Sequence, residues 1–224
     1  MSKPGLTLAH LGMGTGTHRP FDAIFPNSVL VEPEEIEDVK PDALVIWGGS
    51  DISPSLYNDT VADLCGASSE LSGRDRAEAT ACKQAISQGI PIIGVCRGAQ
   101  LACALAGGRL IQHVDSHAGG VHSIDTYDDK QVKSSSVHHQ MMYPFDVDHK
   151  MIAWSTENRS KRYIIGTNEN DPEMEGKVEP EIVWFPKIKA LAIQGHPEFH
   201  SNPDRDPFVQ YCLGLVRNFC LGEE

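Results

Sequence analysis

The stretch Ile92-Ile93-Gly94-Val95-Cys96-Arg97-Gly98-Ala99-Gln100 passes directly from a strand-like run into a helical one. Its apolar start is typical of a short buried strand, and the Ala- and Leu-rich continuation to position 106 predicts a helix. Gly-x-Cys-x-Gly at the junction is the pattern of a nucleophile elbow, with Cys where many hydrolases carry Ser. Side chains at positions 94 and 98 would collide with the neighbouring strand or helix in so tight a turn. We therefore expect Cys96 at a helix N-terminus, where the dipole and free N–H groups favour a thiolate.

The elbow pattern alone does not decide the function, because a short motif also fits a buried cysteine at a strand–helix junction. If Cys96 is a nucleophile, the backbone N–H of Arg97 points to the place where an oxyanion forms. A thiol nucleophile also needs a base, and the base needs a group that orients it. The remaining sequence must supply these parts.

His196 is the candidate base. It follows a predicted buried strand, and Glu198 stands two residues further on, so both side chains project to the same side of an extended segment. Pro197 between them fixes its own φ and restricts His196. Glu198 can then bond one imidazole nitrogen while the other faces Cys96. A solvated His-Pro-Glu turn is the alternative.

A second oxyanion donor is expected from Gly48 or Gly49, which end the predicted strand 43–47. Loops that follow the carboxyl ends of parallel strands share one edge of the sheet, so this pair lies on the same edge as the elbow. Glycine there lets the backbone approach a substrate closely. The alternative is an ordinary turn after a strand.

Strand-like and helical segments alternate along the chain, which predicts an α/β fold with a mostly parallel sheet and helices on both faces. The predicted strands are 6–11, 28–31, 43–47 and 91–95, with short ones near Leu110, Ser123, Ile152, Tyr163, Ile182 and Ala190. The predicted helices are 74–88, 97–106 and 206–220, with at most a short one at 34–39. The acidic segment 168–180 is expected to be an exposed loop. Residues 1–224 are expected to form a single domain.

The other histidines offer weaker candidates. His138 and His139 are adjacent, so on a strand they face opposite ways and one of them is structural. His113, His117 and His122 suggest a loop cluster; a metal site there is the less favoured alternative. No metal or other cofactor is expected.

Composition excludes some classes of partner. The net charge of -12 argues against a nucleic-acid backbone or an anionic membrane as the main partner. The six cysteines show no CxxC pair or zinc-type spacing, and reduced thiols fit a cytoplasmic protein. No apolar run approaches the roughly 20 residues that a membrane helix needs, and the N-terminus has no signal-peptide layout.

Taken together, Gly48-Gly49, the Cys96 elbow and Gly195-His196-Pro197-Glu198 resemble the class I glutamine amidotransferases. Further matches resemble the branch that contains γ-glutamyl-γ-aminobutyrate hydrolase. They are Gly48-Gly49-Ser50-Asp51-Ile52-Ser53-Pro54 with Tyr57, Arg74-Asp75, Cys96-Arg97-Gly98-x-Gln100, and Gly107-Gly108-Arg109-Leu110 with Gln112.

The resemblance implies a flavodoxin-like three-layer α/β sandwich and a Cys96–His196–Glu198 triad that forms a γ-glutamyl thioester. It also implies that Gln100 contacts the glutamyl group and that Ser136, Val137 and His138 help to hold the substrate. A serine at 134 or 135 replaces an asparagine that is common in the family. The part before position 43 looks compressed, with little room for a first helix.

The expected reaction is hydrolysis of a γ-glutamyl amide bond, in glutamine or in a γ-glutamyl-amine. Two alternatives stay open: a glutaminase subunit that delivers ammonia to a separate synthetase, and a non-catalytic binding protein of the same fold. The expected partner is a small γ-glutamyl substrate, with a separate synthetase or a second copy of the chain as further options.

Overall fold

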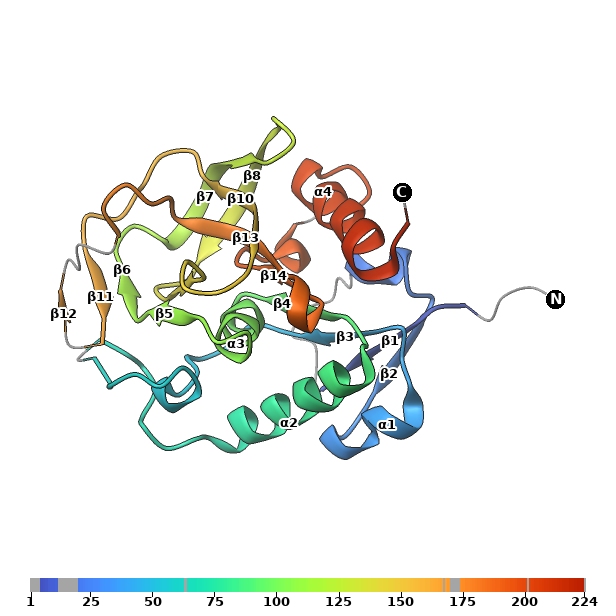
Figure 1. Ribbon diagram of the computed structural model, residues 1–224. Coiled ribbons are helices and arrows are strands. Elements are labelled where there is room, and N and C mark those ends of the chain that lie inside the picture. The colour runs from blue at the N-terminus through green and yellow to red at the C-terminus, as the bar shows by residue number, and fades with distance from the viewer. Residues whose placement is uncertain are drawn as a thin grey trace.

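A long sheet runs through the middle of the computed structural model (Figure 1). The structure describes residues 5–11, 20–62, 64–166, 174–200 and 202–223, and the backbone of 168–169. Among these residues the sheet has nine strands, in the order β2-β1-β3-β4-β14-β13-β10-β7-β8.

One half of the sheet is parallel. Its neighbouring strands, which pair in register from β2 to β14, are β2 (Asn27–Leu30), β1 (Thr7–His10), β3 (Ala43–Ile46), β4 (Ile92–Val95) and β14 (Ala190–Ile193). Since β3, β4 and β14 are adjacent and point the same way, the segments that follow them meet at one edge. The loop after β3, the elbow after β4 and the His-Pro-Glu turn after β14 are thereby brought together.

Antiparallel strands extend the sheet beyond β14. They are β13 (Pro180–Phe185), β10 (Lys150–Ser155), β7 (Ala118–Thr126) and β8 (Gln131–Val137). Because each pairs antiparallel with its neighbour, β13 and β7 run against all the other strands, which share one direction. The central sheet is therefore mostly parallel, as expected.

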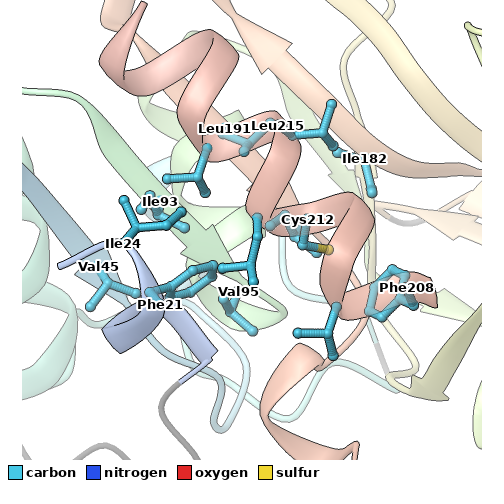
Figure 2. Packing of buried hydrophobic residues seen from close by; sticks show 14 of the residues in the cluster. Phe21, Ile24, Val45, Ile93, Val95, Ile182, Leu191, Phe208, Cys212 and Leu215 are labelled. Atoms are coloured by element: carbon cyan, nitrogen blue, oxygen red, sulfur yellow. The ribbon is translucent and has the colours of Figure 1, made fainter. Parts of the chain in front are cut away.

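Alternation of side chains along the strands separates two cores. On one face, Val45 of β3 packs in a hydrophobic cluster that also contains residues of the 3₁₀ turn Pro20–Ala23 and of helix α4 (Pro207–Leu215). Figure 2 shows this cluster. Leu44 and Ile46 point to the other face. That face is covered by α1 (Ile36–Val39), α2 (Gly73–Gln88) and α3 (Arg97–Leu105). The result is the three-layer sandwich that the sequence predicts.

The ends of the helices follow local signals. Ser72 caps α2 and exchanges hydrogen bonds with Asp75, while Gly89 ends it in the left-handed conformation at φ 69°. Asp206 caps α4 by accepting from the N–H groups of Phe208 and Val209, and a π-helical turn (Val216–Cys220) continues that helix. The predicted helix boundaries are confirmed to within a residue or two.

Two small sheets lie beside the main one. β5 (Arg109–Ile111) pairs with β9 (Met141–Tyr143), and β11 (Tyr163–Ile165) joins β6 (His113–Val114) to β12 (Asn168–Glu169). The expected exposed loop at 168–180 is wrong in its described part. Met174 and Glu179 are buried, and β13 begins at the buried Pro180. The acidic composition wrongly predicted solvent exposure, because the buried carboxylate of Glu179 has partners that are distant in sequence.

The compressed N-terminal part is consistent with the structure as far as it is described. A 3₁₀ turn (Pro20–Ala23) precedes β2, while residues 12–19 lie outside the described residues. No helix among the described residues is both long enough and apolar enough to cross a membrane.

Candidate active site

Cys96 stands at the sharp turn between β4 and α3. Its backbone has φ 51° and ψ −106°, a conformation that costs a non-glycine residue about 1–3 kcal/mol. The flanking glycines permit this turn: a Cβ at Gly94 would lie 2.4 Å from the carbonyl oxygen of Gly98. A Cβ at Gly98 would lie 2.1 Å from the carbonyl oxygen of Ile46 on β3. The backbone geometry is therefore that of a nucleophile elbow, as the sequence predicts.

His196 lies beside Cys96 and is held by Glu198. The distance from Nδ1 of His196 to Oε1 of Glu198 is 2.7 Å, and both side chains are buried. Gly48 lies against them, because a Cβ there would be 2.6 Å from Cε1 of His196 and 3.4 Å from Cβ of Cys96. The fold thus gathers Gly48, Cys96, His196 and Glu198, which come from three separate segments of the chain.

The environment of His196 favours its protonated form. Burial opposes the charge, but hydrogen bonds to Cys96 and Glu198 outweigh it and raise the pKa of His196 to about 9. An imidazolium next to a thiol is the arrangement that supports a thiolate nucleophile. The ring can then return its proton to a leaving group.

Two further residues hold His196 in place. The hydroxyl oxygen of Ser135 accepts the backbone N–H of His196 at 2.7 Å. The ring of Phe199 stacks on the imidazole with centroids 4.2 Å apart and planes 4° from parallel. The sequence does not single out Phe199, and Ser135 is expected only as part of the segment that helps to hold the substrate, where a serine replaces a common asparagine. Phe199 directly follows the His-Pro-Glu turn, whereas Ser135 and His196 are 61 residues apart in the sequence.

A buried ion-pair network links the elbow helix α3 to helix α2. The guanidinium of Arg97 is almost fully buried and contacts Asp75 at 2.6 Å and Glu78 at close range. Both carboxylates belong to α2, so the network joins the first turns of α2 and α3. From the sequence only the backbone N–H of Arg97 is expected to take part, because nothing local reveals the partners of its side chain.

Arg74 binds the loop that contains Gly48 and Gly49. Its guanidinium donates to the carbonyl oxygens of Trp47 and Gly48 at 3.0 and 2.9 Å, and to Glu78 at 2.7 Å. In a trans peptide the C=O and the following N–H point in opposite directions. The N–H groups of Gly48 and Gly49 are therefore turned away from Arg74.

The expected substrate-binding residues fall into two groups. Gln100 is buried one turn beyond Cys96 and donates to the carbonyl oxygen of Gln140 at 3.1 Å, while Val137 is 45% exposed at the end of β8. Ser136 and His138 are buried. The Ser136 hydroxyl contacts His117, and Nδ1 of His138 lies 2.9 Å from the carbonyl oxygen of Gln140.

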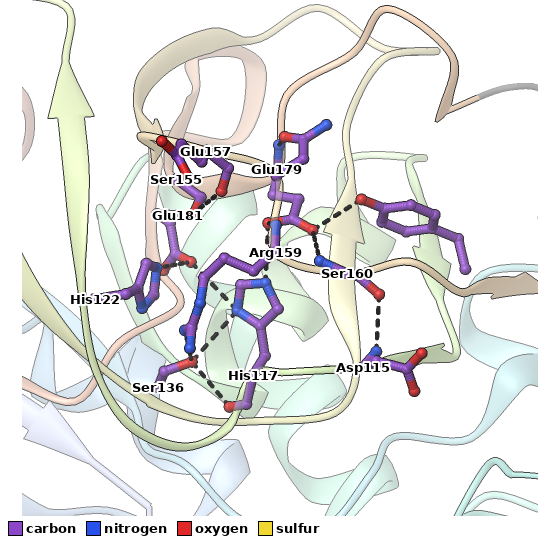
Figure 3. Close-up of polar contacts among 12 residues, drawn as sticks. Asp115, His117, His122, Ser136, Ser155, Glu157, Arg159, Ser160, Glu179 and Glu181 are labelled. Carbon is purple, nitrogen blue, oxygen red and sulfur yellow. Dashed lines mark hydrogen bonds and ion pairs between the residues drawn. The ribbon is translucent and has the colours of Figure 1, made fainter.

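The expected loop cluster of histidines is wrong. His113 lies on β6 and its ring contacts that of His139, whereas His117 and His122 pack together at and near the start of β7. His138 follows β8 rather than lying within a strand, and its ring is 4.9 Å from that of His117. Burial and the neighbouring imidazole of His117 lower the pKa of His138 to about 3. Figure 3 shows the polar contacts around His117 and His122.

The peptidase C26 family model matches residues 32–146, a stretch that holds Gly48, Gly49, Cys96 and Gln100. With the three-layer fold and the elbow geometry, this match identifies the class of protein. The chain is a class I glutamine amidotransferase-like protein and belongs to the peptidase C26 family.

Curated relatives are similar over part of their length. The glutamine amidotransferase-like protein YvdE of Lactococcus lactis subsp. lactis is 35% identical over 105 residues, which cover 43% of this chain and 44% of that protein. A carbamoyl phosphate synthase small chain of Xanthomonas axonopodis pv. citri is 26% identical over 137 residues, covering 61% of this chain and 31% of that one. The match thus spans less than half the length of each relative.

Solved structures share the fold. The glutaminase domain of Trypanosoma brucei CTPS with bound acivicin has a TM-score of 0.58 at 15% identity and covers 98% of this chain and 95% of that chain. A glutamine amidotransferase from Thermotoga maritima has a TM-score of 0.56 at 12% identity, with coverage of 87% and 77%.

Proposed function

We propose that the protein hydrolyses a γ-glutamyl amide bond through a thioester on Cys96. The observation that carries the proposal is the contact chain from Cys96 through His196 to Glu198, set at a strained elbow. Membership of the peptidase C26 family supports hydrolysis of an amide bond. The names of the similar proteins support glutamine as the simplest substrate.

The reaction begins with the thiolate of Cys96 and the imidazolium of His196. Sulfur attacks the γ-carbonyl carbon, and the N–H of Arg97 and that of Gly48 or Gly49 hold the oxyanion. The contacts of Arg74 support this role, since they turn the glycine N–H groups away from the Arg74 side. His196 then gives its proton to the departing nitrogen, the C–N bond breaks, and the amine leaves.

Water completes the cycle. His196, now neutral, takes a proton from a water molecule that attacks the thioester carbon. The C–S bond breaks, glutamate is released, and Cys96 and His196 return to the starting ion pair. Glu198 acts as a positioning residue that keeps Nδ1 of the ring engaged.

We assign the binding of the substrate's glutamyl group to Gln100 and Val137. Gln100 stands on the elbow helix one turn from Cys96, and Val137 is accessible at the end of β8. The Ser136 hydroxyl and Nδ1 of His138 are bonded to backbone carbonyl oxygens, and both residues are buried, so we assign them to holding this segment rather than to direct substrate contact. The matches to the γ-glutamyl-γ-aminobutyrate hydrolase branch favour a larger leaving amine than ammonia.

The test compares two substrates with purified protein. Glutamine and γ-glutamyl-γ-aminobutyrate are supplied side by side, and glutamate and ammonia are measured, with Cys96→Ala as the control. Glutamate release from either substrate that is lost in Cys96→Ala supports the proposal. No release from either substrate by the wild-type protein, or equal release by Cys96→Ala, contradicts it.

A second candidate is delivery of ammonia to a separate synthetase. It is favoured by the similarity to a protein named as the small chain of carbamoyl phosphate synthase. Fast hydrolysis of glutamine without any partner counts against tight coupling of this kind. Release confined to the larger amide favours the stand-alone hydrolase.

A further inference from the structure

A second group of buried polar side chains comes from β7, β13 and the residues that flank β7, β8 and β13, and part of it is drawn in Figure 3. It contains His117, His122 and His138, together with Glu179 and Glu181, and its members are at most 9% exposed. The proposed hydrolysis does not use this group. Buried ionisable groups need partners, so each atom of the group must be accounted for.

The hydrogen bonds fix where the protons of two histidines lie. Nδ1 of His138 faces the carbonyl oxygen of Gln140 at 2.9 Å, and since a carbonyl only accepts, that nitrogen carries the proton. Nε2 of His138 is then a bare lone pair, and it is buried without a partner among the described residues. Nε2 of His117 lies 3.0 Å from Oε2 of Glu179 and donates there, which leaves Nδ1 with the lone pair. The Ser136 hydroxyl lies 3.3 Å from that Nδ1, but it donates its proton to the carbonyl oxygen of His117 at 2.9 Å.

Glu181 supplies a carboxylate oxygen to the same space. Its Oε1 accepts from Nε2 of His122 at 2.7 Å, whereas its Oε2 is buried and has no partner within the described part of the chain. Ligand atoms of His117, His138 and Glu181 all lie within 4.8 Å of one another. Two imidazole nitrogens and one carboxylate oxygen are therefore close enough together to serve as ligands of one cation.

We propose that His117, His138 and Glu181 bind a divalent transition-metal cation of the zinc type. Two histidines and a glutamate are an established zinc ligand set, with bonds of about 2.0–2.2 Å and a fourth position open to water. Such bonds place ligand atoms about 3.3–3.6 Å apart in a tetrahedron, so the side chains must close in by about an ångström.

The surroundings match an outer shell around such an ion. Glu179 and the Gln140 carbonyl orient the two imidazoles, and His122 bonds the carboxylate of Glu181. A cavity of about 350 Å³ is lined in part by His122, whose ring packs against that of His117, and by Arg159, which donates to the Ser136 hydroxyl.

A second proton on His117 is the competing explanation. It would let His117 bridge Glu179 and Glu181, whose Oε1 is 3.8 Å from Nδ1. That proton would still leave Nε2 of His138 and Oε2 of Glu181 without partners, whereas a cation satisfies both. The metal would join β13 to the residues that precede β7 and follow β8, close to Ser135 on β8, whose hydroxyl oxygen accepts the backbone N–H of His196.

The test is a zinc titration of chelator-treated protein, in which isothermal titration calorimetry measures the binding. It is made in the Cys96→Ala background, because a thiol beside His196 also attracts zinc. We expect one equivalent to bind, with at least a tenfold loss of affinity in both Glu181→Gln and His117→Gln. His149→Gln is the matched control, because His149 also bonds a backbone carbonyl but lies outside the group. Absence of binding, or equal binding in all variants, overturns the proposal.

X-ray absorption at the zinc edge of the loaded Cys96→Ala protein serves if the Glu181 and His117 variants fail to fold. We expect a shell of nitrogen and oxygen with two imidazoles and no sulfur. Sulfur in the shell, or no imidazole signature, overturns the assignment. This readout does not depend on hydrolysis, so its failure leaves the proposed reaction of Cys96 standing.

Discussion

Nδ1 of His196 lies 2.7 Å from Oε1 of Glu198 across a single proline. The short span and the restricted backbone at Pro197 hold the two side chains on one side of the chain. Engaging Nδ1 leaves Nε2 as the nitrogen available to Cys96. This pair determines the orientation of the proposed base, and the first prediction follows from it.

Glu198→Gln should lower kcat/KM by about 10–100-fold and change its pH dependence. The folded-state pKa of His196 is raised from 6.5 to about 9, so the ring holds its proton up to that pH. A neutral amide supports that charge less, so the alkaline limb of the pH profile should move to lower pH. The free energy of unfolding should also depend on pH. The stabilisation that comes from the raised pKa of His196 is complete below pH 6.5 and is lost as the pH rises through about 9. A limb that stays in place would show that Glu198 does not act through His196.

Gly48→Ala should reduce kcat by about 100-fold, because the new methyl group would lie 2.6 Å from Cε1 of His196 and displace the ring. Gly73→Ala is the matched control, since a Cβ at Gly73 meets nothing within 4 Å. Steady-state kinetics of the two variants measure the difference. Equal activity of both would mean that the position of His196 is not critical.

Arg97→Ala should destabilise the fold by about 3–5 kcal/mol, because it leaves Asp75 and Glu78 buried without their cation. Arg109→Ala breaks a partly exposed pair with Asp146 and a cation–π contact with Tyr143, and should cost about 1–2 kcal/mol. Urea unfolding of both variants gives the comparison. A loss at Arg97 no larger than that at Arg109 would rule out a supporting role for the buried network.

Cys96→Gly should be more stable than Cys96→Ala by about 1 kcal/mol. Glycine adopts φ 51° and ψ −106° without the strain that a Cβ imposes, whereas alanine keeps it. Thermal unfolding measures the difference between the two variants, both of which lack the thiol. Equal stability would indicate an unstrained elbow.

Local patterns carry most of what the sequence predicts correctly. The elbow, the glycine pair and the His-Pro-Glu turn each lie within a few residues, and parallel strands bring such segments to one edge. Steric demands at Gly94 and Gly98 are visible in the sequence because only glycine fits there.

Long-range contacts are what the sequence does not reveal. The partners of Arg97 lie on another helix, and Glu181 meets His122 from a different strand. No periodicity predicts that pairing, because it depends on the antiparallel order of β13, β10 and β7. The acidic composition of 168–180 indicated solvent exposure, but Glu179 is fully buried. Composition does not reveal its partner His117, because that residue is distant in the sequence.

The covalent intermediate on Cys96 is the most direct test of the central claim. Protein mixed with a γ-glutamyl amide is quenched with acid during turnover, and the peptide containing Cys96 is analysed by mass spectrometry. The mechanism predicts one added glutamyl group on that peptide, its removal by hydroxylamine, and its absence in Cys96→Ala. Turnover without any adduct on Cys96, or an adduct on another cysteine, would contradict it.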